Sequence, residues 1–398
     1  MKQGWEIKKL VDVCIVERGS SPRPIEKFQT DSQDGVNWIK IGDTKGVDKY
    51  IYTTKEKITK EGAEKSRYVK EGDFILSNSM SFGKPFIMKT DGYIHDGWFV
   101  LHLHKFIDTE YFFNLLSSPY VNDQFHKLAS GSVVKNISGD LVKKVILPIP
   151  PLHEQKRIVA ILDEAFAAIA KAKAIAEQNL KNSKELFESY LQGVFENKGE
   201  GWVEKTLGDI GKPSMCKRIL KEQTSSDGDI PFYKIGTFGK TPNAYISKDI
   251  YDLYRTKFSF PKKGDILISA SGTIGRRVRY NGEPAFFQDS NIVWIDNDET
   301  QVLNDYLYVF YEFCDWQPSK GATIARLYNS NLTSIKIAFP KSLKEQQITI
   351  QKLDALSLET KRLEAIYQQK INDLEELKKS VLQKAFSGEL KTVNKVLL

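Results

Sequence analysis

Two long stretches of the chain alternate apolar and polar positions with the period of an α-helix. Residues 152–196 and 343–387 contain no proline, and their single glycine is Gly193. Small or apolar side chains recur along both stretches in steps of three and four residues, which is the spacing of a coiled-coil face. The predicted seam comprises Ala165, Ile169, Ala172, Ala176 and Leu186 in the first stretch, and Leu356, Leu363, Tyr367, Leu374 and Leu377 in the second.

Each predicted helix has about 45 residues and would be about 65 Å long. A lone helix cannot cover such a seam, so each helix needs a partner. We predict an antiparallel pair within the chain, because the alanines of the first stretch would face larger side chains of the second. Such a pair would hold two globular domains at opposite ends and relate them by an approximate twofold axis. A homodimeric coiled coil is the alternative.

The regions that precede the two helical stretches have a different pattern. Residues 1–150 and 201–341 are rich in aromatic residues, glycine and proline, and short β-branched runs such as 292–295 predict strands. Apolar segments near 111–116 and 306–310 predict one helix in each region. Each region therefore predicts an α+β domain, and each is long enough to bury its own core.

The two halves of the chain repeat one plan, which indicates an internal duplication. The opening Trp5, Leu10 and Asp12 recur as Trp202, Leu207 and Asp209, and Leu152-x-Glu-Gln155 recurs as Leu343-x-Glu-Gln346. The predicted fold class is a duplicated α+β protein whose two globular domains are separated by two long helices forming an antiparallel coiled coil. The predicted boundaries are 1–150 and 198–341 for the domains, 151–197 and 342–390 for the helices, and 391–398 for a tail.

Composition narrows the class of protein. With 41% hydrophobic and 27% charged residues, the chain is typical of a globular protein. The longest apolar run, 158–170, is interrupted by Asp163 and Glu164 and is shorter than the roughly 20 residues of a membrane-spanning helix. The three cysteines lie far apart, which favours neither a disulfide framework nor a zinc site. We expect a cytoplasmic protein without membrane association, whose net charge of +7 permits nucleic-acid binding without requiring it.

Catalytic and cofactor-binding patterns are weak in this sequence. The segment 236–241 is similar to a phosphate-binding loop, but Lys234 stands where that loop needs a glycine. His102 and His104 alternate on a predicted strand without a third metal ligand. Asp73 lies in a Gly-Asp turn before a strand, where capping of the turn is favoured over acid catalysis. We therefore predict a chain that is not an enzyme and holds no metal or cofactor of its own.

Both halves instead contain three loops of donor-rich residue types, which contact phosphates and base edges. The residues predicted to bind DNA in the first half are Arg18, Ser20, Ser21, Arg23, Asn78, Ser79, Ser81, Lys84, Ser132, Lys135 and Asn136. Those of the second half are Lys217, Arg218, Ser271, Thr273, Arg276, Arg277, Arg279, Lys320, Thr323 and Arg326. A solvated turn is the alternative for any single loop. Because the framework glycines match while the polar residues differ, we expect the two halves to read different half-sites.

Together these motifs resemble the DNA-specificity (S, or HsdS) subunit of Type I restriction–modification enzymes, over essentially the whole chain. The resemblance rests on the repeated Trp…Leu-x-Asp opening, on Pro148-x-Pro-Pro-Leu-x-Glu-Gln-x-x-Ile158, and on Leu382-Gln-Lys-Ala-Phe-Ser-Gly-Glu-Leu390. One departure is Lys341-Ser342, which replaces the Pro-Pro pair before the second helix and leaves the start of that helix open.

The resemblance implies a non-catalytic subunit with two target-recognition domains, each reading one half of an asymmetric bipartite site in double-stranded DNA. Its helices would space the domains and dock two methyltransferase (M) subunits, which carry S-adenosylmethionine and methylate adenine. Restriction (R) subunits would add cleavage that depends on ATP and Mg. Two alternatives stay open, namely an S-like subunit of a modification-only or fused nuclease system and a coiled-coil scaffold for other proteins.

Two further hypotheses concern mechanism. Helix length would set the number of unread base pairs between the half-sites, and Arg276 and Arg279 would contact DNA through the second domain. Both hypotheses depend on how the loops and helices pack.

Overall fold

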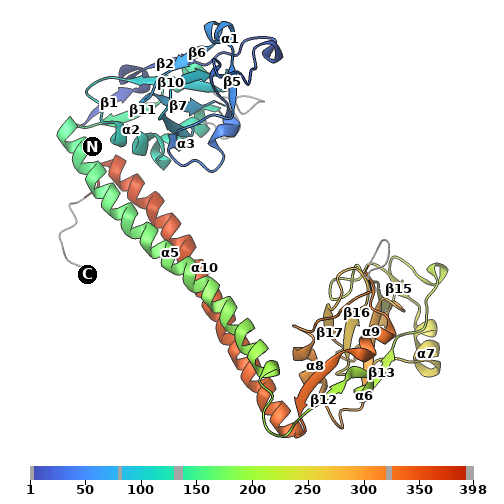
Figure 1. The fold of residues 1–398 in the computed structure, drawn as a ribbon. Helices are drawn as coiled ribbons and strands as arrows, with labels where there is room; N and C mark the ends of the chain where they lie inside the picture. Colours follow the sequence, from blue (N-terminus) through green and yellow to red (C-terminus); the bar gives the residue numbers. More distant parts are fainter. Residues whose placement is uncertain (1–3, 79–82, 130–137, 320–324, 391–398) are drawn as a thin grey trace. The chain divides into compact units, whose positions relative to one another are not determined.

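The computed structural model describes residues 4–78, 83–129, 138–319 and 325–390 of the chain. They form two compact units (Figure 1). Unit 1 comprises Met1–Gln178 and Tyr367–Leu398, and unit 2 comprises Asn179–Ile366. Each unit contains one globular region and part of each of the two longest helices, which are α5 (Leu152–Glu196) and α10 (Leu343–Ser387). The compact units thus divide both helices, whereas the boundaries predicted from the sequence keep each helix separate.

Unit 1 contains two β-sheets and a pair of strands. One sheet has the order β2-β10-β7-β8-β4, the other has the order β5-β3-β9-β6, and β1 pairs antiparallel with β11. The strands are β1 (Glu6–Lys9), β2 (Cys14–Arg18), β3 (Val36–Ile39), β4 (Tyr50–Ile51), β5 (Glu56–Ile58), β6 (Arg67–Val69), β7 (Phe74–Ser77), β8 (Pro85–Met88), β9 (Gly92–Ile94), β10 (Trp98–Leu103) and β11 (Ile146–Ile149). The shorter helices are α1 (Lys60–Glu64), α2 (Thr109–Leu116), α3 (Pro119–Ala129) and α4 (Gly139–Val142).

Unit 2 repeats this arrangement with fewer strands in each sheet. Their orders are β13-β19-β16-β17 and β15-β14-β18, and β12 pairs antiparallel with β20. The strands are β12 (Trp202–Thr206), β13 (Gly211–Ser214), β14 (Ile230–Tyr233), β15 (Tyr245–Ile246), β16 (Ile266–Ser269), β17 (Arg277–Arg279), β18 (Phe286–Phe287), β19 (Ile292–Asn297) and β20 (Lys336–Pro340). The shorter helices are α6 (Leu207–Ile210), α7 (Lys248–Lys257), α8 (Asn304–Phe310) and α9 (Asn329–Ser334).

The central strands have the same order and pairing in both units. The run β2-β10-β7-β8 of unit 1 corresponds to β13-β19-β16-β17 of unit 2. All residues of β7 and β16 are buried, as expected for apolar strands covered on both faces. In each unit the first strand also pairs with the strand that leads into a long helix. The predicted duplication and α+β class are therefore confirmed.

The two long helices pack against each other within each unit. In unit 1, Ile158 near the start of α5 belongs to the same core as Phe386 near the end of α10. Farther along α5, Lys173 forms an ion pair with Glu375 at 2.7 Å. In unit 2, the end of α5 shares a core with the beginning of α10. The helices are therefore antiparallel partners within one chain, as predicted, and the homodimeric alternative is not needed to cover the seam.

The packed face differs from a strict heptad seam at two predicted positions. The side chains buried or half-buried along it include Ala165, Ile169, Ala172 and Ala176 on α5, and Leu356, Leu363, Tyr367 and Leu374 on α10. Leu186 and Leu377 are 52% and 47% exposed, so their assignment to the seam is wrong. Each lies two heptads after a seam residue, and a helix drifts by about 20° per heptad. The buried positions Thr360, Ile371 and Leu382 instead follow an eleven-residue spacing, which suits a straighter helix.

A buried glutamine joins the start of each long helix to the adjacent globular region. Gln155 is 1% exposed, and its Oε1 accepts the N–H of Asp108 at 2.7 Å. Its Nε2 donates to the carbonyls of Phe106 and Pro150 at 3.2 and 2.9 Å. Gln346 makes the same three kinds of contact in unit 2, to the backbone of Leu303, Gln301 and Pro340. Both helix starts are thus attached by satisfied, buried hydrogen bonds.

The second long helix begins at Leu343 although Lys341-Ser342 replaces the proline pair. Ser342 Oγ accepts the N–H of Glu345 at 3.4 Å, which is the contact of a helix N-cap. The two long helices therefore start at corresponding residues of the repeat, Leu152 and Leu343. In the described part of the chain, the structure has no helix with both the length and the apolarity needed to cross a membrane.

Candidate nucleic-acid interface

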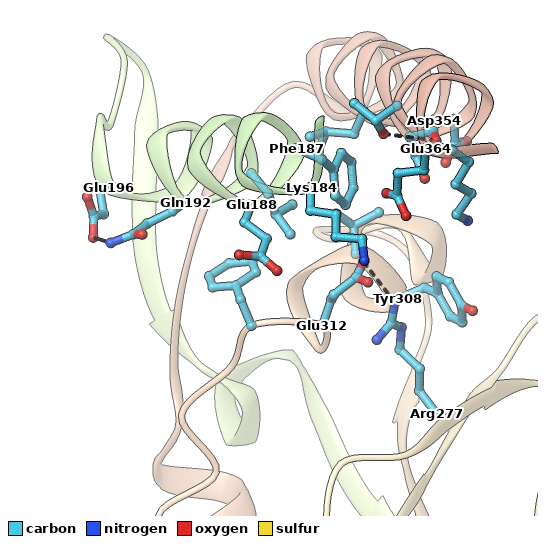
Figure 2. Close-up of a pocket in the computed structure, with 17 residues that line it drawn as sticks. Lys184, Phe187, Glu188, Gln192, Glu196, Arg277, Tyr308, Glu312, Asp354 and Glu364 are labelled. Carbon is cyan, nitrogen blue, oxygen red and sulfur yellow. Dashed lines mark hydrogen bonds and ion pairs between the residues drawn. The ribbon is translucent and has the colours of Figure 1, made fainter. Parts of the chain in front are cut away.

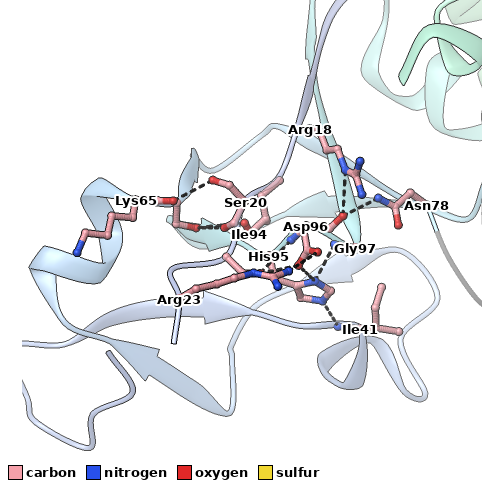
Figure 3. A network of polar contacts seen from close by, with 12 residues as sticks. Arg18, Ser20, Arg23, Ile41, Lys65, Asn78, Ile94, His95, Asp96 and Gly97 are labelled. Atoms are coloured by element: carbon pink, nitrogen blue, oxygen red, sulfur yellow. Dashed lines mark hydrogen bonds and ion pairs between the residues drawn. The ribbon is translucent and has the colours of Figure 1, made fainter. Parts of the chain in front are cut away.

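Four predicted residues of unit 1 come together around an aspartate that the sequence analysis did not select. Asp96 lies in the turn between β9 and β10, and Figure 3 shows its contacts. Its Oδ1 accepts a hydrogen bond from Ser21 Oγ at 2.6 Å, and its Oδ2 lies 3.8 Å from Arg23 Nη2. Its backbone carbonyl accepts from Arg18 Nε at 3.4 Å and from Asn78 Nδ2 at 2.7 Å. The first and second predicted loops therefore meet at this turn.

The Asp96 turn combines a carboxylate with a neutral imidazole. The hydrogen bond from Ser21 is the largest cause that lowers the pKa of Asp96, so its carboxylate is ionised near pH 7 and accepts hydrogen bonds only. Burial lowers the pKa of the adjacent His95, so its ring is neutral near pH 7. The Nδ1 of this ring accepts the N–H of Gly97 at 2.7 Å. The His95 ring is thus used by the backbone, and the turn presents the Asp96 carboxylate as an acceptor beside Arg18 and Arg23.

Two other predicted residues of unit 1 form hydrogen bonds away from the Asp96 turn. Ser20 Oγ donates to the carbonyl of Lys65 at 3.1 Å. Lys84 Nζ donates to the carbonyl of Val47 at 3.1 Å and lies 4.9 Å from the centre of the Phe86 ring. Neither of these hydrogen bonds involves Asp96. The contact of Ser20 and Lys84 with DNA stays a prediction.

In unit 2 all three predicted loops meet at the equivalent turn, between β18 and β19. Arg218 Nε pairs with Asp289 Oδ2 at 2.8 Å. Ser271 Oγ donates to Asn291 Oδ1 at 2.7 Å, and Arg326 Nη2 donates to the same oxygen at 3.3 Å. Residues far apart in the sequence thus form one polar surface, as in unit 1, but the central residues differ between the units.

A matching glycine shapes the second loop of each unit. Gly83 and Gly275 have positive φ angles of 82° and 83°, a backbone region that side chains disfavour. An added Cβ would lie 2.7 Å from the ring of Phe125 in unit 1 and 2.2 Å from the ring of Trp316 in unit 2. Both positions therefore need glycine, which explains why the framework matches while the polar residues around it differ.

The arginines of β17 face α8 rather than the turn before β19. Arg277 pairs with Glu312 at 2.9 Å, and Arg279 pairs with Asp305 at 2.7 Å. Both guanidinium groups lie over the Tyr308 ring, 4.5 and 5.1 Å from its centre. Figure 2 shows Arg277 beside a cavity of about 910 Å³ lined by α5, α8 and α10. Their predicted contact with DNA thus gains no support from the packing.

The remaining predicted residues of unit 2 vary in their surroundings. Arg276 Nη1 donates to the carbonyl of Phe238 at 3.0 Å. Lys217 is exposed, with its Nζ 4.8 Å from the centre of the Phe258 ring, and Thr273 is exposed. The predicted residues Ser79, Ser81, Ser132, Lys135, Asn136, Lys320 and Thr323 lie outside the described residues.

The residues considered for catalysis have structural contacts. Asp73 Oδ2 accepts the N–H of Lys70 at 3.0 Å, which is the capping role predicted for the turn. His102 Nδ1 lies 2.9 Å from Asp73 Oδ1, and its Nε2 lies 3.4 Å from Glu17 Oε2. Among the described residues, no group of three or more His, Cys, Asp or Glu side chains could hold a metal ion.

The sequence contains a signal for the residues that were missed. Polar residues immediately precede β10 and β19, the corresponding central strands of the two repeats, and they include Asp96 and Asn291. Aligning the two halves at these strands would have selected both turns. The search for donor-rich residue types passed over Asp96 because a carboxylate is only an acceptor.

The fold and the two loop surfaces define a duplicated protein with two recognition regions. A family of known proteins, described as the Type I restriction modification DNA specificity domain, matches residues 2–178 and 199–376. The chain belongs to this family. A Haemophilus influenzae protein described as "Putative type I restriction enzyme specificity subunit S.HindORF215P" is 44% identical over 295 residues, which cover 72% of this chain and 75% of that protein.

Two further relatives extend the similarity over nearly the whole chain. The MjaIX specificity subunit of Methanocaldococcus jannaschii is 24% identical, with 97% of this chain and 94% of that protein covered. The crystal structure of the HsdS subunit from Thermoanaerobacter tengcongensis has a TM-score of 0.65 at 20% identity, with 98% of each chain covered. A structure from a study of complex assembly in the type I R-M system has a TM-score of 0.76 at 20% identity, covering 98% of this chain and 99% of that chain. These structures share the fold of this chain.

Proposed function

We propose that this chain is the DNA sequence-specificity subunit of a Type I restriction–modification complex. Each unit reads one half of an asymmetric bipartite site in double-stranded DNA. The observation that carries this proposal is the convergence of separate polar loops on one turn in each unit, with different residues at the centre. Two equivalent scaffolds with different central residues would read two different half-sites.

The partners of the chain follow from its long helices. We propose that two methyltransferase subunits dock on α5 and α10 and carry the S-adenosylmethionine, and that restriction subunits supply the steps that use ATP and Mg. Exposed apolar side chains on these helices support docking, among them Leu186, Leu358, Ile366 and Leu377. In this proposal the chain itself performs no catalysis and acts in the cytoplasm.

Adenine-methylation mapping tests the function directly. DNA from cells that carry this gene beside a neighbouring methyltransferase gene is compared with DNA from a deletion strain. We expect a bipartite asymmetric motif that disappears on deletion. An unchanged methylome with both proteins expressed would reject the proposal and favour a protein scaffold, whereas cleavage assays separate a full restriction system from a modification-only one.

The packing of unit 2 predicts which arginine reads DNA. Arg218→Ala is expected to lower methylation of the preferred motif by about tenfold, or to relax one half-site, because its side chain is 68% exposed at the loop surface. Arg279→Ala is the matched control, since this arginine also pairs with an aspartate but lies against Tyr308. A motif altered by Arg279→Ala and left intact by Arg218→Ala would contradict this assignment.

A further inference from the structure

Among the described residues, only one oxygen of the Asp96 carboxylate accepts a hydrogen bond from another side chain. The backbone of Asp96, not its side chain, accepts the hydrogen bonds from Arg18 and Asn78. Oδ1 accepts from Ser21, whereas Oδ2 lies 3.8 Å from Arg23, which is beyond hydrogen-bond distance. The side chain is 47% exposed. Within the part of the chain that the structure describes, Oδ2 of this ionised acceptor thus has an ion pair but no hydrogen bond, at the point where the loops of unit 1 meet.

Asp96 lines an open hollow of about 680 Å³. Arg23, Lys40 and His95 line the same hollow, together with Trp38, which is 2% exposed. Figure 3 shows Arg23, His95 and Asp96 grouped at this place. The hollow gives a base edge room to approach the carboxylate, and Arg23, whose side chain is 82% exposed, offsets part of the repulsion between the carboxylate and the DNA backbone.

The chemistry of DNA limits what an ionised carboxylate can bind. Phosphates offer only acceptors, so a carboxylate finds donors only on the base edges. In the major groove these donors are the amino groups of cytosine N4 and adenine N6. Adenine places the acceptor N7 beside its amino group, which repels a carboxylate, whereas cytosine offers its amino group without such an acceptor on the same base. For an approach through the major groove, cytosine is therefore the base that fits Asp96.

The corresponding turn of unit 2 presents its acceptors differently. Its aspartate, Asp289, pairs through Oδ2 with Arg218 at 2.8 Å, and its side chain is 16% exposed, compared with 47% for Asp96. Asn291 Oδ1 already accepts from both Ser271 and Arg326. Arginine can only donate, so this contact also establishes which side of the Asn291 amide is oxygen. Both turns therefore contain an aspartate, but only the carboxylate of unit 1 is half exposed and, among the described side chains, without a cation at hydrogen-bond distance, which favours a role for Asp96 in the specificity of unit 1.

We propose that Asp96 is a specificity-determining residue that accepts a hydrogen bond from the N4 amino group of a cytosine in the half-site of unit 1. This inference rests on the proposed function and adds the identity of one base that the protein reads. Ser21 acts as a positioning residue, because its hydrogen bond to Oδ1 holds the carboxylate at the edge of the hollow that both residues line.

The test measures methylation of synthetic duplexes by the complete complex with its methyltransferase partner. Each base pair of the motif is substituted in turn, and Arg218→Ala identifies the half-site of unit 2. Asp96→Asn keeps the size of the side chain and presents a donor in its place. We expect it to lower the preference for a C·G pair at one position of the other half-site by about tenfold. Ser21→Ala should weaken the preference at the same position.

Glu71→Gln is the matched control, since it removes one negative charge from an exposed side chain of the same unit. It should leave every preference unchanged. The proposal is overturned if Asp96→Asn and Ser21→Ala preserve the preference, alter a position that is not C·G, or act in the half-site affected by Arg218→Ala. If Asp96→Asn abolishes all methylation, Ser21→Ala decides by the same criteria. Absence of any bipartite motif for the unaltered complex would instead reject the proposed function.

Discussion

Replacement of Gln346 by leucine is expected to lower the free energy of unfolding of unit 2 by about 3 kcal/mol. The leucine would leave the N–H of Leu303 and the carbonyls of Gln301 and Pro340 without their side-chain partner. These groups lie where α10 joins the globular region, and Gln346 itself is fully buried. Urea unfolding followed by circular dichroism measures the change.

The neighbouring Gln347 provides the control for this prediction. It has the same side chain on the same helical turn but is exposed. Gln347→Leu should change the free energy of unfolding by less than about 0.5 kcal/mol. The equivalent Gln155→Leu should destabilise unit 1 by an amount similar to that found for Gln346→Leu in unit 2, because its three contacts are of the same kind. Equal effects of Gln346→Leu and Gln347→Leu would show that the buried network does not hold the helix.

Lengthening both long helices is expected to change the spacing of the recognised DNA motif. Four residues inserted between Gln178 and Asn179 and four between Ile366 and Tyr367 add about 6 Å to each helix. That length is near two base pairs at about 3.4 Å each. We expect the methylated motif to keep both half-sites and to gain about two unread base pairs, as measured by adenine-methylation mapping.

Two further variants separate the effect of helix length from other effects of changing the helices. Substituting four exposed residues at the same points, without insertion, should leave the spacing unchanged. An insertion in only one helix should abolish methylation, because it moves the seam of α5 out of register with that of α10. If the double insertion methylates sites with the original spacing, helix length does not set the distance between the half-sites.

The outcome of the seam prediction follows from helix geometry. Local periodicity selected Ala165, Ile169, Ala172 and Ala176, which do face the partner helix. The heptad count failed two repeats later at Leu186, because the packed face of a nearly straight helix moves relative to a seven-residue period. Periodicity therefore identifies the helix and its first contacts, whereas the path of the seam depends on the partner.

The structure shows how the predicted loop residues are arranged, whereas their contact with DNA stays a prediction. Arg218, Ser271 and Arg326 were selected as donors from three separate loops, and one turn brings them together. Arg277 and Arg279 have the same residue type but contact α8. Composition cannot separate these cases, because the direction of a side chain depends on the strand that carries it and on what packs opposite.

By itself the sequence determined the duplication, the two long helices, the α+β class and the family, because these depend on local periodicity and on short motifs that recur in order. Only the tertiary structure decided which polar residues meet. Ser21 and Asn78 lie 75 and 18 residues from Asp96 along the chain, yet both bond to it. Such contacts form because the pairing of β10 with both β2 and β7 brings distant loops to one edge. Register and packing, rather than residue type, therefore placed Asp96 at the centre of these contacts.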